Sequence, residues 1–132
     1  MTPIPPPTPT TPTAGPPTGI IIECIFFDGL VLRSESDEYV QLLNTTAVEI
    51  DLAGWVLRDT ADDTPSFAFP DYQLRPSGRI RVYTDEVHPE WGGFTFGWGR
   101  SVWNNNPSEP DTAGLFNPQG QLVSAKSYPP GC

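Results

Sequence analysis

The residues that could do catalytic chemistry in this chain are few and poorly spaced. His88 is the only histidine, it is followed by Pro89, and no Gly-x-Ser-x-Gly nucleophile motif occurs. A nucleophile triad needs a base that an acid holds in place, and this sequence offers no such set. Carboxylates are numerous, but glycoside hydrolysis needs a cleft that brings two of them together, and nothing here indicates one. We therefore expect no enzyme activity and no catalytic residue.

Metal binding has one candidate segment, the acidic run that follows residue 58. Asp59, Asp62 and Asp63 carry oxygens of the kind that Ca²⁺ prefers. The run lacks an Asp-x-Asp-x-Asp-Gly pattern, so we interpret it as a solvated acidic loop and keep calcium binding as the alternative. Cys24 and Cys132 lie at no zinc spacing and have no histidine partners. We expect no metal ion and no cofactor.

The two cysteines could instead bond to each other. A bridge between Cys24 and Cys132 would close nearly the whole domain into a loop, which stabilises a fold by roughly 4–5 kcal/mol in the chain-entropy model. The alternative is a buried thiol at Cys24 and a frayed one at the last residue. A free thiol at the end of an exported chain is a liability, so we predict the disulfide, which favours an exported protein.

Aromatic side chains gather in one irregular segment, residues 88–111, and offer the only binding chemistry that the sequence suggests. Glycines interrupt the segment, which predicts a long loop packed by its own rings. The rings could form a platform for sugars or for a partner chain, or they could fold back and cover one end of the domain. We expect Trp55 and Trp103 to lie in the core. The speculative ligand-binding residues are Trp91, Phe94, Phe96 and Trp98.

The elements that position these residues have the alternating pattern of β-strands. The clearest signal is at 38–43 and 55–58, where Val40 and Leu42 share one face and Trp55 and Leu57 another. We expect these two runs to pair, with Glu38, between solvent and core, marking the start of the first. In the run 79–84, Ile80 and Val82 point inward while Arg79, Arg81 and Tyr83 point outward. In the run 20–27, we expect Ile20, Ile22, Cys24 and Phe26 on one face.

Further short strands are predicted at 66–69, 102–103, 114–116 and 122–126, with a tight turn at 117–120 between the last two. Several strands at short spacing and no helical period predict an all-β sandwich of about seven to nine strands. Residues 20–132 have the length of one such domain. Residues 1–19 hold eight prolines, six threonines and no charge, which predicts a disordered Pro/Thr-rich linker or stalk.

Charge restricts the partners that this domain can have. The net charge is −9, and residues 20–63 carry ten acids against two arginines. Such a surface repels phosphate backbones, so we expect no nucleic-acid partner. We find no apolar run long enough to cross a bilayer and no signal peptide. The sequence therefore reads as an excerpt that begins within a linker of a longer protein.

The order of several short motifs resembles the lamin tail domain family in its bacterial form. The matching stretches are 37–40 with Asn44, 51–57 with Asp59, Phe67 with 69–70, Leu74 with Pro76 and Gly78, 81–83, 103–105, Leu115, and Gly120 before Val123. The resemblance covers nearly all of residues 20–132. It implies an immunoglobulin-like β-sandwich without enzymatic activity, of the kind that accompanies other domains on exported or surface proteins.

These observations lead to one functional expectation and one alternative. We expect a non-catalytic interaction or display module of an exported or surface bacterial protein, structural or protein-binding, located outside the cell or at its surface. The partner would be a protein or a cell-surface glycan, and the module itself a monomer. The alternative is a carbohydrate-binding module that uses the aromatic loop 91–98, since such modules also sit on Pro/Thr linkers and use exposed rings.

Overall fold

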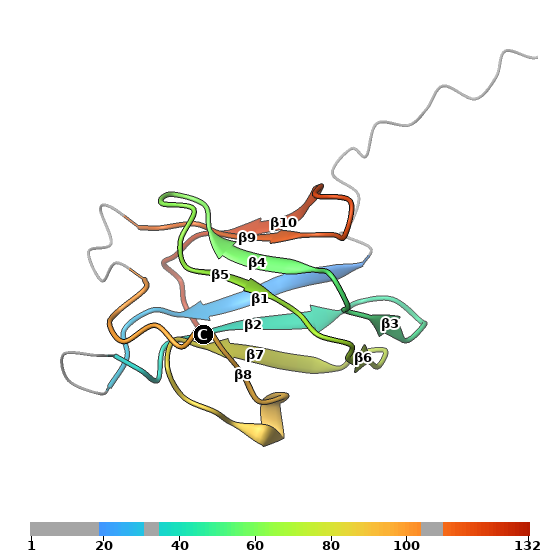
Figure 1. Cartoon of the computed structure of the whole chain (residues 1–132), viewed down its shortest axis with the longest axis horizontal. Helices are drawn as coiled ribbons and strands as arrows, with labels where there is room; N and C mark the ends of the chain where they lie inside the picture. Colours follow the sequence, from blue (N-terminus) through green and yellow to red (C-terminus); the bar gives the residue numbers. More distant parts are fainter. Residues whose placement is uncertain (1–18, 31–34, 104–109) are drawn as a thin grey trace, which may run out of the picture.

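The computed structural model describes residues 19–30, 35–103 and 110–132. Within them the chain is all-β, and Figure 1 shows its strands stacked as two layers. The first sheet has the order β1-β2-β7-β8, formed by β1 (Ile20–Phe26), β2 (Tyr39–Asn44), β7 (Arg79–Tyr83) and β8 (Phe94–Thr95). The second has the order β10-β9-β4-β5, formed by β10 (Leu122–Lys126), β9 (Ala113–Phe116), β4 (Val56–Asp59) and β5 (Ser66–Ala68). A small ribbon pairs β3 (Ile50–Asp51) with β6 (Gln73–Leu74), and the 3-10 helix η1 (Pro89–Trp91) precedes β8.

The core lies between the two sheets and confirms the predicted all-β sandwich. Val40 and Leu42 are buried, as are Ile80 and Val82 on the neighbouring strand, so the inward faces predicted for β2 and β7 are correct. The second sheet contributes buried residues to the same cluster, including Leu57 and Leu115. Trp103 is fully buried, as predicted, whereas Trp55 is half-buried and packs against the cluster from its margin.

The predicted pairing of the runs 38–43 and 55–58 is wrong. β2 pairs with β1 and β7, while β4 pairs with β5 and β9, so the two runs belong to opposite sheets. Between them the chain forms β3 and then a turn in which Gly54 has a φ of 82°, a backbone conformation that glycine adopts without strain. The connection carries the chain across the sandwich and does not fold it back as a hairpin.

Strand β1 departs from strict alternation, so its predicted face is wrong after Ile22. Its pairing with β2 shifts register between Ile22 and Cys24, which is the signature of a β-bulge. The extra residue turns Cys24 and Phe26 away from the core and buries Ile25 in their place. Alternation along the sequence cannot reveal such a bulge, because the inserted residue restarts the pattern on the other face.

Part of the predicted long loop 88–111 forms a strand along the edge of β7, and residues 104–109 of this loop lie outside the described residues. β8 pairs with β7 in parallel, and two further bonds continue the ladder, from Phe96 N to Tyr83 O at 2.8 Å and from Trp98 N to Thr84 O at 2.8 Å. The strand predicted at 102–103 is wrong. The backbone N–H groups of Val102 and Trp103 donate to the carboxylate of Glu38 and to no strand partner among the described residues.

The predicted linker, residues 1–19, lies outside the described residues except for its last member. Gly19 N donates to Thr45 Oγ1 at 3.0 Å, and Thr45 N donates to Gly19 O at 2.9 Å, so Gly19 is bonded to the residue that follows β2. Across the described ranges, we find no helix with the length and apolar character that a membrane crossing requires.

Candidate functional site

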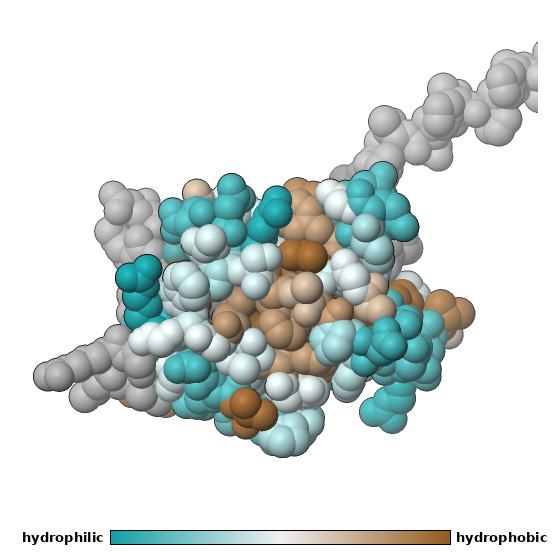
Figure 2. All heavy atoms as spheres, viewed as in Figure 1, coloured by the Kyte–Doolittle hydropathy of each residue, from teal (hydrophilic) through white to brown (hydrophobic). Residues whose placement is uncertain are grey.

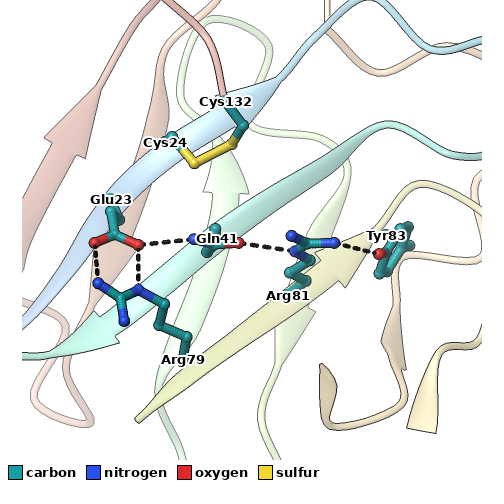
Figure 3. The surroundings of a disulfide bond; sticks show 7 residues. All are labelled: Glu23, Cys24, Gln41, Arg79, Arg81, Tyr83 and Cys132. Atoms are coloured by element: carbon teal, nitrogen blue, oxygen red, sulfur yellow. Dashed lines mark hydrogen bonds and ion pairs between the residues drawn. A yellow bond between two sulfur atoms is a disulfide. The ribbon is translucent and has the colours of Figure 1, made fainter. Parts of the chain in front are cut away.

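The outer face of the first sheet carries a continuous set of polar and aromatic side chains. Val40 in β2 and Val82 in β7 point inward. The residues that alternate with the inward-pointing ones in each strand therefore point away from the core. Figure 3 shows five outward side chains side by side across β1, β2 and β7, next to the disulfide: Glu23, Gln41, Arg79, Arg81 and Tyr83. We call the following set the arginine face: Tyr39, Gln41, Arg81, Tyr83 and Trp91.

A chain of hydrogen bonds fixes the polar part of this surface. Arg79 binds the carboxylate of Glu23 with two bonds, Nε to Oε1 at 2.7 Å and Nη2 to Oε2 at 3.0 Å. Gln41 Nε2 donates to Glu23 Oε1 at 2.7 Å, and Arg81 Nε donates to Gln41 Oε1 at 2.8 Å. Hydrogen bonding to Arg79 is the main reason why the pKa of Glu23 lies below its usual value. Gln41 therefore links the ion pair of Glu23 and Arg79 to the guanidinium of Arg81.

Aromatic rings hold the guanidinium of Arg81 on two sides. Its Cζ atom lies 4.0 Å from the ring centre of Tyr39 and 3.7 Å from that of Trp91. Its Nη1 donates to the hydroxyl of Tyr83 at 3.0 Å. Cation–π contacts and a planar fork of donors together restrict the guanidinium to one orientation. Arg81 is half-buried, so this oriented cation remains accessible in part.

The outward position predicted for Tyr83 is correct in direction, but the side chain is covered. Tyr83 is 4% exposed because the ring of His88 stacks on it, with ring centres 4.0 Å apart. His88 Nε2 contacts Glu86 Oε1 at 2.7 Å, and Nδ1 contacts Glu90 Oε1 at 2.8 Å. The bond to Glu86, and then that to Glu90, raises the pKa of His88. An imidazole with both nitrogens engaged by carboxylates supports the surface and is ill suited to act as a general base.

The predicted disulfide between Cys24 and Cys132 is present at the margin of the arginine face. Its Cα atoms are 5.1 Å apart, and it joins residues 108 positions apart in the sequence. The last residue is also held by its backbone, since Cys132 N donates to Ile25 O at 3.1 Å. Tyr128 stacks on Phe27 with ring centres 4.3 Å apart, which fixes the C-terminal segment against β1.

The structure separates the four loop aromatics that the sequence grouped. Trp91 lies over Arg81 on the outer face of the first sheet. Phe94 is buried and meets the rings of Phe67, Phe69 and Tyr72. Phe96 and Trp98 are half-buried and pack against the core. Of the four, Trp91 is the one that joins the arginine face.

Glu38, expected between solvent and core at the start of a strand, is fully buried instead. Oε1 accepts hydrogen bonds from Val102 N at 2.9 Å and from Thr84 Oγ1 at 3.1 Å. Oε2 accepts a bond from Ser101 Oγ at 3.2 Å. Burial raises the pKa of Glu38 to about 7, although the backbone donors act in the opposite direction. Glu38 therefore anchors the segment after β8 to the start of β2.

The acidic residues considered for calcium are arranged differently from their order in the sequence. Carboxylate oxygens of Asp59, Asp62 and Asp111 lie within 4.8 Å of one another and could hold a metal ion. Asp63 instead faces Arg58, with Nε and Oδ1 3.7 Å apart. Burial raises the pKa of Asp59 to about 6, and the neighbouring charges of Asp111 and Asp62 contribute. Crowded acids of this kind are common without an ion.

Sequence reasoning placed Arg81 and Tyr83 on an outward face but did not recognise a surface there. Two signals were available: outward Arg and Tyr alternating with buried Ile and Val in β7, and outward Tyr and Gln alternating with buried residues in β2. The missing information was the register that sets Gln41 opposite Arg81 and Tyr39 opposite Tyr83.

Comparison with known proteins identifies a family for this fold. The family model described as Lamin Tail Domain matches residues 13–130. A search of curated proteins finds no significant match.

Proposed function

The chain belongs to the lamin tail domain family, and we propose that it is a non-catalytic interaction module whose binding surface is the arginine face. Domains of this family are immunoglobulin-like and usually serve in interactions. The partner we propose is a protein, bound outside the cell or at the surface of the bacterium that exports the parent chain. In this view residues 1–19 are a Pro/Thr spacer and residues 20–132 the binding domain, which acts as a monomer.

One observation carries this proposal: the guanidinium of Arg81 is fixed between the rings of Tyr39 and Trp91 on a half-exposed surface. Tyrosine, tryptophan and arginine are the residues that most often dominate the energy of protein–protein interfaces. Binding also loses less entropy when such side chains are already fixed. Here the hydrogen bonds through Gln41 and Tyr83 fix them before a partner arrives.

The disulfide supports the proposed location. Bonds of this kind form and persist in oxidising compartments and are rare in the reducing cytosol. Cys24 and Cys132 are bonded to each other, and no free cysteine occurs among the described residues. The Pro/Thr composition of residues 1–19 fits a spacer that holds the module away from a neighbouring domain or a cell surface.

The geometry favours a protein over the alternative of a glycan. Sugar rings stack on exposed aromatic faces, and the arrangement of the loop aromatics offers little of this kind. Phe94 is buried, Phe96 and Trp98 pack against the core, and one face of Trp91 is already occupied by Arg81. A glycan array separates the two ideas, because glycan binding that is lost in Trp91→Ala or Trp98→Ala would favour the alternative.

The proposal is tested with a phage-displayed library of random peptides selected on the native domain. We expect most selected peptides to lose at least tenfold in affinity for Arg81→Ala and Trp91→Ala. The matched control is Val87→Ser, which changes a residue that is 64% exposed in the segment after β7. Peptides that bind both variants as tightly as the native domain would place the binding surface elsewhere.

A further inference from the structure

A second surface lies on the other side of the sandwich, on the outer face of the sheet β10-β9-β4-β5. The register sets Leu122 beside Phe116, Phe116 beside Val56, and Val56 beside Ala68. Since the neighbouring residues Leu57 and Leu115 point into the core, these four side chains point outward. Figure 2 shows apolar atoms gathered in the middle of this face. We call Val56, Ala68, Phe116 and Leu122 the apolar row.

The apolar row is accessible to a partner. Leu122 is 54% exposed, Ala68 is exposed, and Phe116 and Val56 are half-exposed. Gly114 lies beneath the side chains of Phe116 and Leu122. A Cβ atom built on Gly114 would lie 3.1 Å from Phe116 Cε1 and 3.3 Å from Leu122 Cδ1. The two larger side chains therefore lean over Gly114 and lie low across the sheet. The result is a broad apolar surface and not a set of separate projecting side chains.

The size of the apolar row limits what can cover it. Four adjacent strands span ~14 Å from the first to the last, at ~4.8 Å between neighbours. A stable contact between two domains buries roughly 800 Å² on each partner, which is more than four side chains provide. A single segment of chain, lying across the strands, matches the row.

Charge indicates which kind of segment this is. Asp62 and Asp63 are exposed in the loop that follows β4. Arg58 connects this loop to the row, since its Cζ lies 4.0 Å from the ring centre of Phe116 while its Nε lies 3.7 Å from Asp63 Oδ1. Arg58 offsets the charge of Asp63 beside Phe116, but the neighbouring acids Asp59, Asp62 and Asp111 leave this part of the surface with more negative than positive charge. A net charge of −9 on every copy opposes the pairing of two copies through this face.

We propose that the apolar row docks a basic, amphipathic segment of another protein. Its apolar side chains cover Phe116 and Leu122, and its lysines or arginines face Asp62 and Asp63. This surface is on the sheet opposite to the arginine face. The inference therefore does not depend on the proposed function, and the module would join two different partners.

The test uses two synthetic peptides as probes, one that alternates lysine with leucine and one that alternates glutamate with leucine. Each is titrated into the ¹⁵N-labelled native domain, and amide shifts are mapped by NMR. We expect the lysine peptide to shift amides of β4, β9 and β10 and to bind at least tenfold more tightly than the glutamate peptide. Leu122→Glu should weaken its binding at least tenfold, and Asp62→Asn with Asp63→Asn several-fold.

Controls keep the test decisive. Val87→Glu introduces the same charge at a residue that is 64% exposed in the segment after β7, and it should leave binding unchanged. Ala68→Glu repeats the test at the opposite end of the row, should Leu122→Glu fail to fold. Equal binding of both peptides, or shifts confined to β2 and β7, would overturn the proposal. So would a concentration-dependent dimer in sedimentation that Leu122→Glu abolishes, because it would assign the row to a second copy.

Discussion

Glu38 shows how a single residue can make the stability of this domain depend on pH. Its carboxyl group is fully buried, with a pKa raised from 4.5 to about 7. The folded protein therefore binds this proton more tightly than the unfolded chain does. The stabilisation is complete below about pH 4.5 and is lost as the pH rises through about 7.

We predict that Glu38→Gln removes this dependence. The amide can still accept the bond from Val102 N, and it can donate to Ser101 Oγ as a protonated carboxyl group would. Relative to the native protein, the variant should gain roughly 1–3 kcal/mol of unfolding free energy between about pH 5 and about pH 8. Urea denaturation at a series of pH values measures this, with Asp59→Asn as the control, because the pKa of the Asp59 carboxyl group is also raised into this range, to about 6.

A difference between Glu38→Gln and the native protein that stays constant across this range would contradict the account. It would mean that Glu38 is ionised in the folded state at all these pH values. In that case, its four donors would outweigh the effect of burial.

At the scale of elements, the strands of the second sheet depend on the absence of a side chain at Gly114. A Cβ atom there would lie 2.5 Å from Thr60 Cγ2, which is closer than real contacts allow. We predict that Gly114→Ala lowers the unfolding free energy by roughly 1–3 kcal/mol. Thr60→Ser removes the methyl group and keeps the hydroxyl that bonds to Thr112 O, so the double variant should regain part of the loss.

Thermal unfolding of the two single variants and the double variant measures this coupling. Additive effects would contradict the steric explanation. Thr60→Ser alone serves as the control, because it reports what the loss of the methyl group costs when residue 114 has no side chain.

The link between the first strand and the C-terminus gives a second prediction at this scale. The disulfide joins residues 108 positions apart, so it strongly restricts the unfolded chain. Replacing Cys24 and Cys132 by serine should lower the unfolding free energy by roughly 4–5 kcal/mol, as measured by urea denaturation. A loss below about 1 kcal/mol would contradict this account, because it would mean that the bridge contributes little by restricting the unfolded chain.

The sequence was sufficient for the longer strands and for most inward faces. It missed the two-residue strands β3, β6 and β8, wrongly predicted a strand at 102–103, and was insufficient for the strand partners. Alternation identified Val40, Leu42, Ile80 and Val82 as core because burial repeats every second residue. Alternation does not encode which sheet a strand joins, so the runs 38–43 and 55–58 were wrongly paired. The buried Glu38 was also misplaced, because the donors that satisfy it come from residues more than 40 positions later.

The arginine face could not be predicted from the sequence for a related reason. Trp91 reaches Arg81 only because η1 and β8 follow the edge of β7, and nothing local predicts the parallel pair. The disulfide, by contrast, was predictable, since only two cysteines exist and both ends of the domain carry one.

At the scale of the whole molecule, we propose that residues 20–132 fold as one unit without the preceding segment. Gly19 is held by two hydrogen bonds to Thr45. We propose that the residues before it are a spacer. Removing residues 1–18 should therefore change the unfolding free energy by less than about 0.5 kcal/mol. Thermal and urea denaturation of the shortened chain measure this, and a larger loss would show that the segment packs on the domain.

The most direct test of the central claim is the affinity of a peptide selected on the native domain for Arg81→Lys. Lysine keeps the charge but lacks the planar fork that lies between Tyr39 and Trp91 and bonds to Gln41. If the oriented guanidinium is the centre of the binding surface, calorimetry should show a loss of at least tenfold with an unchanged fold. An affinity equal to that of the native domain would contradict the account.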